Sequence, residues 1–288
     1  MRWQGGRQSS NVDDRRGVSG GQVAVGGGIL GVIALVLNFL IGGEVDPSQL
    51  PQLPGAGGGQ TSQPLSPQEA AADAERGEFV KTVLAHTEDV WNEVFQKSGQ
   101  DYPDPTLVLF RDAVQSGCGN ATAASGPFYC PADQKLYIDL AFYGDLQSRF
   151  GAPGDFAMAY VVAHEVGHHI QTLMGTSEKM ARLRGRVSEE EYNANSVKME
   201  LQADFLAGVW AHHMKGKTIN GQPVLEQGDF EEALNAANAI GDDRLTKGRV
   251  SPESFTHGTS AQRMHWFRKG YNTGDINQGD TFSNVEVQ

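Results

Sequence analysis

The chain has 288 residues, with 23 Lys and Arg residues against 35 Asp and Glu residues, so its formal net charge is −12. This excess of negative charge argues against sequence-independent binding of nucleic acids, because phosphate contacts need a positive surface. Only two cysteines occur, Cys118 and Cys130, which excludes a disulfide-dense scaffold and a zinc module built from four cysteines. Hydrophobic residues make up 39% of the chain, enough for a globular core without implying several membrane spans.

The most apolar stretch covers residues 23–43 and reads VAVGGGILGVIALVLNFLIGG. It holds no charged residue, and about 20 apolar residues are enough to cross a bilayer as a helix. A cleavable signal peptide would have a shorter apolar run and an A-x-A cleavage site, which the residues that follow do not offer. The sequence therefore predicts an uncleaved transmembrane helix at 23–43, through which the protein contacts the lipid bilayer.

The flanking charges predict the orientation of this span. Four arginines precede it, whereas the first charges after it are Glu44 and Asp46. The positive-inside rule then makes residues 1–22 a cytoplasmic tail and places the rest of the protein outside the cytoplasm, in the periplasm or at the cell exterior. In such an oxidising compartment Cys118 and Cys130 are expected to form a disulfide, with two buried free thiols as the alternative.

The remaining chain divides by composition and periodicity. Residues 44–68 are rich in Pro and Gly and lack Lys and Arg, so we expect a flexible linker there. Ser66 and the residues after it are typical of a capped helix start, and Gly77 predicts a break or kink in that helix. The patterns predict strands at 106–111 and 135–140 and further helices at 154–174, 188–214, 229–240 and 260–270. A few strands followed by helices indicate an α+β domain over 69–275, before a frayed tail at 276–288.

The segment with the most specific chemistry is Ala-His-Glu-Val-Gly-His at 163–168, which contains H-E-x-x-H. Residues four apart share one face of a helix, so His164 and His168 can present ring nitrogens to a single ion, and Zn²⁺ suits imidazole ligands. Glu165 would lie beside the open coordination position and take a proton from a metal-bound water. The alternative is a helix with a few satisfied histidines. His169 falls one residue off the ligand face and is expected to pack or to support a ligand.

A hydrolytic zinc site needs a third protein ligand and leaves the fourth position to water. Glu200 and Asp204 lie four residues apart on the next long helix that the sequence predicts, hence on one face. One of them can bind the metal while the other orients a ligating histidine through its free ring N–H. Such a pair is usually a solvated helix face, but here Ala203, Phe205 and Leu206 beside it are apolar.

H-E-x-x-H followed by E-x-x-A-D resembles the gluzincin branch of zinc peptidases, and the whole chain is similar to the bacterial putative neutral zinc metallopeptidase family. The matching stretches are MRWQGGRQSSNVDDRRG, GPFYCPADQKLYIDL, VVAHEVGHHIQ, MELQADFLAGVWAH and FTHGTSAQRMHWFRKGYNTGD. The resemblance implies a single-pass anchor, a zincin-like α+β catalytic domain and one Zn²⁺ per chain. It implies His164, His168 and Glu200 as ligands and Glu165 as catalytic base, which leaves Asp204 to orient a ligand.

The resemblance also suggests where a substrate would be held. His257, in a loop before the last helix, resembles the downstream histidine that gluzincins use near the transition state, and a plain helix-entry residue is the alternative. Arg263 would then anchor this loop to an acidic partner. In zincins the peptide substrate lies along an edge strand, for which we expect the region 135–140, braced by a link between Cys118 and Cys130.

The leading hypothesis is a membrane-anchored zinc metallopeptidase that hydrolyses peptide bonds of a peptide or protein outside the cytoplasm. A catalytically inactive zincin-fold module for binding or assembly is a second hypothesis, against which the intact Glu165 argues. A zinc amidase that acts on a cell-wall component is a third, and the motif does not distinguish it from a peptidase.

Overall fold

A computed structural model describes residues 1–17 and 65–283. The transmembrane helix predicted at 23–43 lies outside the described residues, as does most of the linker predicted at 44–68. Within 1–17 and 65–283, every helix is too short or too polar to cross a membrane.

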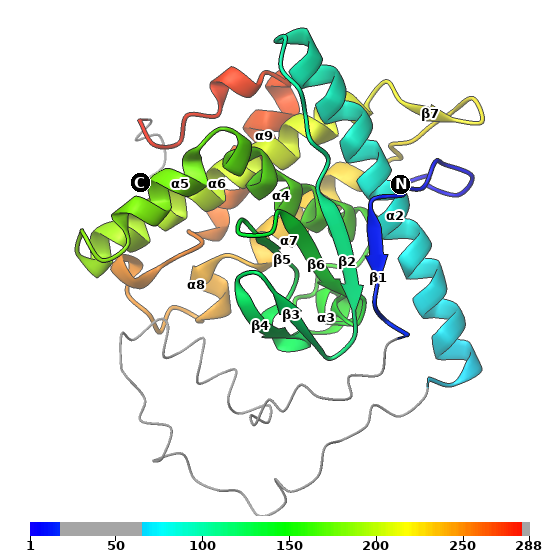
Figure 1. The fold of residues 1–288 in the computed structure, drawn as a ribbon, viewed down its shortest axis with the longest axis horizontal. Helices are drawn as coiled ribbons and strands as arrows, with labels where there is room; N and C mark the ends of the chain where they lie inside the picture. Colours follow the sequence, from blue (N-terminus) through cyan, green and yellow to red (C-terminus); the bar gives the residue numbers. More distant parts are fainter. Residues whose placement is uncertain (18–64, 284–288) are drawn as a thin grey trace, which may run out of the picture.

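The described residues form a mixed α/β domain around one four-stranded sheet (Figure 1). The strand order is β1 (Val12–Asp14), β2 (Thr106–Phe110), β6 (Lys135–Asp139) and β5 (Phe128–Cys130). The first three strands are parallel, and β5 runs antiparallel to β6. Two small hairpins are formed by β3 (Ala113–Ser116) with β4 (Gly119–Thr122) and by β7 (Thr218–Ile219) with β8 (Gln222–Pro223).

The helices account for most of the chain. Before the motif helix come α2 (Pro67–Lys97) and α3 (Phe142–Ser148), and the motif helix itself is α4 (Asp155–Leu173). After it come α5 (Thr176–Leu183), α6 (Glu189–Met214), α7 (Asp229–Ala239), α8 (Asp242–Leu245) and α9 (Ser260–Thr273). The sequence thus predicted the long helices α2, α4, α6, α7 and α9 and the strands β2 and β6, and it missed the short elements.

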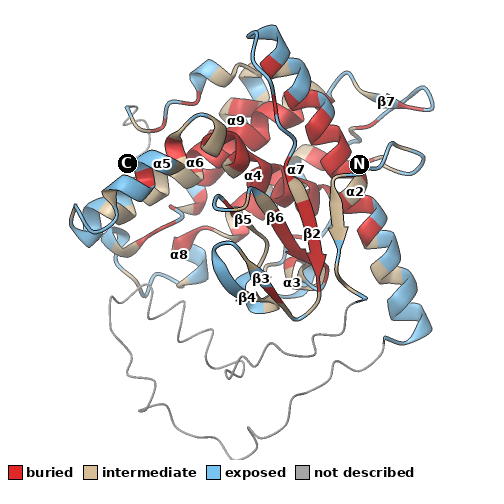
Figure 2. Cartoon of the chain, in the orientation of Figure 1, coloured by how far each residue is buried: buried red, intermediate tan, exposed pale blue. Residues whose placement is uncertain are grey.

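The core lies between the sheet and the central helices. Figure 2 shows buried residues concentrated in α4, α6 and α9 and in β2 and β6, whereas α5 and the β3–β4 hairpin are largely exposed. Helix α4 is apolar around most of its circumference, as a helix enclosed by other elements must be. Helices α6 and α9 touch through their backbones, because a Cβ atom at Gly208 would lie 2.1 Å from the carbonyl oxygen of Phe267. A side chain at this contact would push α9 away from the rest of the core.

The N-terminal segment is part of the domain, so the prediction of a separate tail at 1–22 is wrong for residues 1–17. Strand β1 pairs with β2 from Val12 to Asp14, and the side chain of Met1 is buried. The amino group of Met1 lies between the carboxylates of Asp155 and Asp229, at the starts of α4 and α7. The first residues of the chain therefore hold together two helices of the core.

The arginines that predicted a cytoplasmic tail are ion-paired within the fold. Arg2 pairs with Glu226, Arg7 with Glu88 and Asp89, Arg15 with Asp13, and Arg16 with Asp14 and Asp73. The buried carboxylate of Glu88 also accepts hydrogen bonds from Ser9 and Asn11. The rule that placed these arginines in the cytoplasm counts only their charge along the sequence. It gave no hint of this docking, because the partners that attach the segment to the domain, such as Glu88, Asp73 and Glu226, are remote in sequence.

A bilayer cannot divide a hydrogen-bonded sheet. Residues 1–17 and 65–283 therefore lie on the same side of any membrane. The predicted arrangement, with the N-terminus in the cytoplasm and the catalytic domain outside it, is not compatible with this fold.

Three further predictions need correction. Residues 135–140 are not an edge of the sheet, since β6 lies between β2 and β5, and β5 is the outer strand. Gly77 does not break α2, which is continuous; the absence of a side chain there leaves room for the guanidinium of Arg16, 2.9 Å from where a Cβ would lie. The tail predicted from residue 276 is packed as far as Thr281, which is buried and donates a hydrogen bond to the carbonyl of Lys198.

The shared sheet predicts the result of a labelling experiment. Single cysteines replace Ser10 and Ser98, both exposed, one in the N-terminal segment and one at the end of α2. In intact cells, a membrane-impermeant maleimide is expected to label both positions or neither, because both belong to one folded body. The parent chain is the control, since its cysteines form a disulfide and should not react. Labelling of one position alone would contradict the docking of the N-terminal segment.

Candidate metal centre

The two histidines of the H-E-x-x-H motif lie on one face of α4 and point at α6. Their rings are 4.8 Å apart between centroids and nearly perpendicular. Helices α4 and α6 approach closely at Gly167, where a Cβ would be 3.0 Å from the carbonyl oxygen of Ala203. The glycine inside the motif is thus what lets α6 come close enough for a carboxylate to reach both imidazoles.

That carboxylate belongs to Glu200. Its Oε2 atom is 3.1 Å from Nε2 of His164, and its Oε1 atom is 3.4 Å from Nε2 of His168. One donor atom from each of the three residues lies within 4.8 Å of the other two. The structure therefore brings together the three residues that the sequence predicted as metal ligands.

The far nitrogen of each ring is fixed by a second residue. Nδ1 of His164 is 2.9 Å from Oδ1 of Asp204, and Nδ1 of His168 is 2.8 Å from Oε1 of Gln171. The Gln171 amide donates in turn to the carbonyl of Met199, on α6. Because both Nδ1 atoms donate outward, both Nε2 atoms are free to bind a metal with their lone pairs. Two imidazole nitrogens and one carboxylate oxygen with these supports fit Zn²⁺ and leave room for a water ligand.

The charges of the centre stabilise one another strongly. Burial acts to lower the pKa of His164, but the charge of Asp204 and hydrogen bonds to Asp204 and Glu200 outweigh it and raise that pKa to about 10. The pKa of His168 is raised in the same way by Glu200. Burial acts to raise the pKa of Glu200, but the two histidines hold it well below its usual range. Without a metal, the centre therefore favours the protonated form of both rings more than water does, and a proton on Nε2 competes with metal binding.

Glu165 lies on α4 beside His164 and is 8% exposed. It is the residue next to His164 in the motif, and its charge is one of the contributions that raise the pKa of His168. Among the described residues, no side chain forms a hydrogen bond or ion pair with it. A carboxylate next to the ligands and free of protein partners can accept a proton from a water there.

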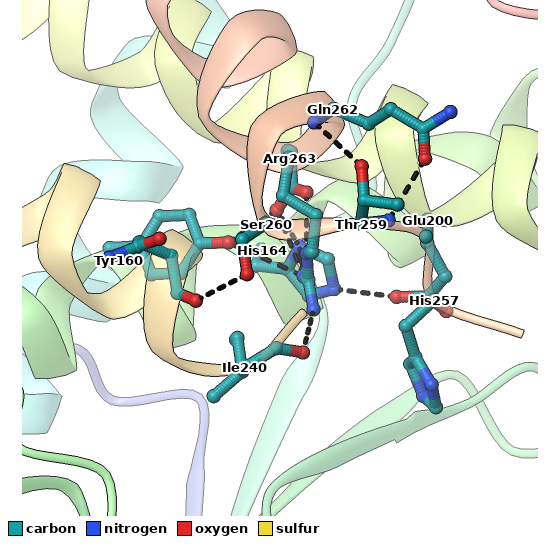
Figure 3. A network of polar contacts seen from close by, with 12 residues as sticks. Tyr160, His164, Glu200, Ile240, His257, Thr259, Ser260, Gln262 and Arg263 are labelled. Carbon is teal, nitrogen blue, oxygen red and sulfur yellow. Dashed lines mark hydrogen bonds and ion pairs between the residues drawn. The ribbon is translucent and has the colours of Figure 1, made fainter. Parts of the chain in front are cut away.

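His257 reaches the site from the loop before α9, and its side chain is half exposed. Its Nδ1 atom is 3.2 Å from Oδ1 of Asp242, whose other oxygen accepts the backbone N–H groups of Thr256, His257 and Gly258. Burial acts to lower the pKa of His257, but Asp242 and the charge of Glu200 raise it. The loop is thus wrapped around the buried carboxylate of Asp242. Figure 3 shows His257 on the same side of the site as Glu200.

Arg263 provides the acidic contact that the sequence predicted for it, and its partner is Asp204. The guanidinium is buried and binds both oxygens of Asp204, through Nε at 2.8 Å and Nη2 at 3.0 Å. Tyr160 donates its hydroxyl to the same carboxylate. Sequence reasoning missed Tyr160, Gln171 and Asp242; only Gln171 had a signal, as an amide three residues after His168 in an otherwise apolar helix.

The outer strand β5 is attached to the motif helix through His169. The hydroxyl of Tyr129, on β5, is 3.1 Å from Nδ1 of His169, and Nε2 of His169 donates to the carbonyl of Pro103. His169 therefore supports the strand and lies outside the group of converging ligand atoms, as predicted. The disulfide between Cys118 and Cys130 is confirmed, and it links the end of β5 to the turn between β3 and β4.

Comparison with known proteins decides the family. A model of the putative neutral zinc metallopeptidase family matches residues 1–282. The chain belongs to this family. It is 48% identical to the uncharacterized protein YpfJ of Escherichia coli strain K12, over 98% of this chain and 99% of that protein. It is 42% identical to the uncharacterized protein Rv2575 of Mycobacterium tuberculosis strain H37Rv, over 77% of each chain. No solved structure matches the chain.

The raised pKa values predict that zinc binding is coupled to proton release. Protons on His164 and His168 must leave before their Nε2 atoms can bind a metal, so the affinity for Zn²⁺ is expected to rise with pH across the neutral range. Calorimetry at pH 7 in buffers of different ionisation enthalpy should show release of about one proton or more per zinc bound. A zinc affinity that does not change with pH, with no proton released, would contradict this account of the centre.

Proposed function

We propose that this protein is a zinc-dependent peptidase, with His164, His168 and Glu200 as metal ligands and Glu165 as general base. The observation that carries the proposal is the convergence of three ligand atoms from His164, His168 and Glu200. Next to His164 on the same helix lies Glu165, whose carboxylate has no hydrogen-bond or ion-pair partner among residues 1–17 and 65–283. A purely structural zinc site is usually closed by four protein ligands, whereas three converge here. The family assignment supports a zinc peptidase at the level of the family.

The side chains fit the steps of peptide hydrolysis. A zinc ion held by the three ligands would acidify a bound water and polarise the scissile carbonyl. Glu165 takes the proton of the attacking water and can deliver it to the nitrogen of the leaving amine. Asp242 holds His257 through Nδ1, and the raised pKa of His257 favours the protonated ring, which can donate from Nε2 to the oxyanion that develops on the carbonyl. Asp204 and Gln171 keep the two imidazoles in the tautomer that binds metal.

The outer strand β5 is the candidate binding strand for an extended substrate, in place of residues 135–140. Its one edge pairs with β6, and within the described residues its other edge has no strand partner. An extended peptide can add to such an edge through main-chain hydrogen bonds. The hydrogen bond between Tyr129 and His169 holds β5 against the motif helix α4. The disulfide at Cys130 holds the C-terminal end of β5.

Two other hypotheses, an inactive binding module and a cell-wall amidase, fit the site less well than a peptidase. An inactive binding or assembly module would have no use for a carboxylate in the position of Glu165. An amidase for a cell-wall component would use the same ligands and base, but a free strand edge favours a peptide. The half-exposed disulfide, with Cys118 at the surface and Cys130 buried, supports an oxidising compartment for the domain. We also propose that residues 23–43 contact the lipid bilayer.

Replacement of Glu165 by Gln should slow hydrolysis strongly without loss of metal. The amide keeps the size of the side chain but cannot accept the proton, so kcat is expected to fall by about 10²–10⁴. Zinc content, measured by elemental analysis, should stay equal to that of the unaltered protein, because Glu165 is not a ligand. Glu190→Gln, an exposed position on α6, is the matched control and should change neither value. If the Glu165 variant kept full activity, the assignment of the base would be wrong.

Replacement of His257 by Gln separates the oxyanion role from a helix-entry role. The loop should keep its shape, because Asp242 still binds three backbone N–H groups. A loss in kcat of about 10²–10³ with little change in KM is expected from removal of an oxyanion donor. His265→Gln, an exposed histidine on α9, serves as the control. Unchanged kcat in the His257 variant would leave this residue with a structural role alone.

A further inference from the structure

Arg263 connects two parts of the site: the helices that carry the metal ligands and the loop that carries His257. It is a buried arginine on α9 that bonds to α6, to α4 and to the end of α7 (Figure 3). Besides Asp204, its Nη2 group is 3.3 Å from the hydroxyl of Tyr160, and its Nη1 group donates to the carbonyl of Ile240 at 3.3 Å. A guanidinium has five N–H donors in a rigid plane, which lets one side chain hold several acceptors in a fixed relation.

On one side, Arg263 contacts the part of the site that carries the metal ligands. Asp204 is completely buried, and its Oδ1 atom accepts from His164 as well as from Tyr160 and Arg263. A carboxylate at this depth needs its partners in good geometry, because an unpaired buried charge is strongly unfavourable. The bidentate contact with Arg263 leaves Asp204 one orientation, and that orientation directs Oδ1 at the ring of His164.

The other part is the loop that presents His257. Ile240, whose carbonyl Arg263 binds, precedes Gly241 and Asp242, the residue around which the His257 loop is wrapped. The approach is tight here, because a Cβ at Gly241 would lie 2.3 Å from the backbone nitrogen of Ser260, at the start of α9. A shift of the guanidinium would therefore displace Asp242 and His257 together.

We propose that Arg263 is a positioning residue for catalysis, which fixes the donor His257 relative to the metal ligand His164. The inference rests on the proposed function, since both ends of the link are defined by it. Arg263 is not one of the residues whose ligand atoms converge. It acts on one side through Asp204 and through a 3.5 Å contact of its Nη2 group with Nδ1 of His164. On the other side it acts through the Ile240–Asp242 segment.

The test is Arg263→Lys, with Arg268→Lys on the exposed face of the same helix as the matched control. A lysine keeps the charge but is a single donor group, so it cannot bind both oxygens of Asp204 and the carbonyl of Ile240 at once. We expect zinc affinity, measured by competition with a chelator, to fall on the order of tenfold or more. We expect kcat at saturating zinc to fall by about tenfold or more while KM changes little.

A readout that does not depend on activity follows the ligand geometry. The protein is loaded with Co²⁺ in place of zinc, and its visible absorption spectrum is recorded for each variant. A changed spectrum in Arg263→Lys, with an unchanged one in Arg268→Lys, is the expected result. An unaltered spectrum, zinc affinity and kcat in a folded Arg263→Lys variant would overturn the proposal and leave the peptidase assignment intact. A lack of zinc binding in the unaltered protein would instead reject the proposed function.

The link to His257 is tested by a double-mutant cycle with Asp242→Asn. Because both changes act on the position of His257, their effects on kcat should be non-additive, whereas independent effects would add. Additive effects would overturn the coupling. Arg263→Gln and Arg263→Met are prepared in parallel. If none of the three Arg263 variants folds, the guanidinium is a requirement of the fold itself, and the positioning role is rejected.

Discussion

The site depends on one fully buried carboxylate, that of Asp204. Three side chains from two helices bind it: His164 and Tyr160 from α4 and Arg263 from α9. Asp204 itself lies on a third helix, α6. Burial acts to raise the pKa of Asp204, and Arg263 and His164 lower it, so the carboxylate stays charged in the core. Breaking a buried ion pair of this kind typically costs about 3–5 kcal/mol, because the remaining charge is left without a partner. Helix packing and the orientation of the first metal ligand are therefore set by the same group.

The metal ligands could be predicted from sequence because they follow from the geometry of single helices. His164 and His168 are four residues apart, and so are Glu200 and Asp204, which fixes the face each pair occupies. What the sequence did not contain was the distance between the two helices. That distance depends on Gly167 meeting the backbone of Ala203, a contact between residues far apart in sequence that no local pattern encodes.

The wrong predictions of the fold have the same origin, contacts between residues far apart in sequence. Strand β1 is only three residues long and is preceded by a segment rich in Gly, Arg and Ser, so neither periodicity nor composition marked it as part of a sheet. Its position is fixed by pairing with β2 and by ion pairs to residues such as Glu88 and Asp73. Likewise β5, with three residues, gave no signal as a strand, and the more regular segment 135–140 was taken for the edge. Short elements held by long-range contacts are where sequence patterns carry least information.

The N-terminal segment and the site are also physically connected. Met1 binds the carboxylate of Asp155 in the first turn of α4, the helix that carries both histidines, and β1 completes the sheet whose other edge is β5. The chain on both sides of residues 18–64 therefore builds one domain. Any attachment of that intervening stretch to a bilayer has to leave the N-terminus with the candidate metal centre.

Metal content of the full-length protein is the most direct test of the central claim. Elemental analysis of the purified chain, after zinc is supplied and excess is removed, is compared with His164→Ala and with the control His265→Ala. The account predicts about one zinc per chain in the unaltered protein and in the control, and none in the His164 variant. A folded, unaltered protein that binds no zinc, or a His164 variant that binds as much as the parent, would contradict it.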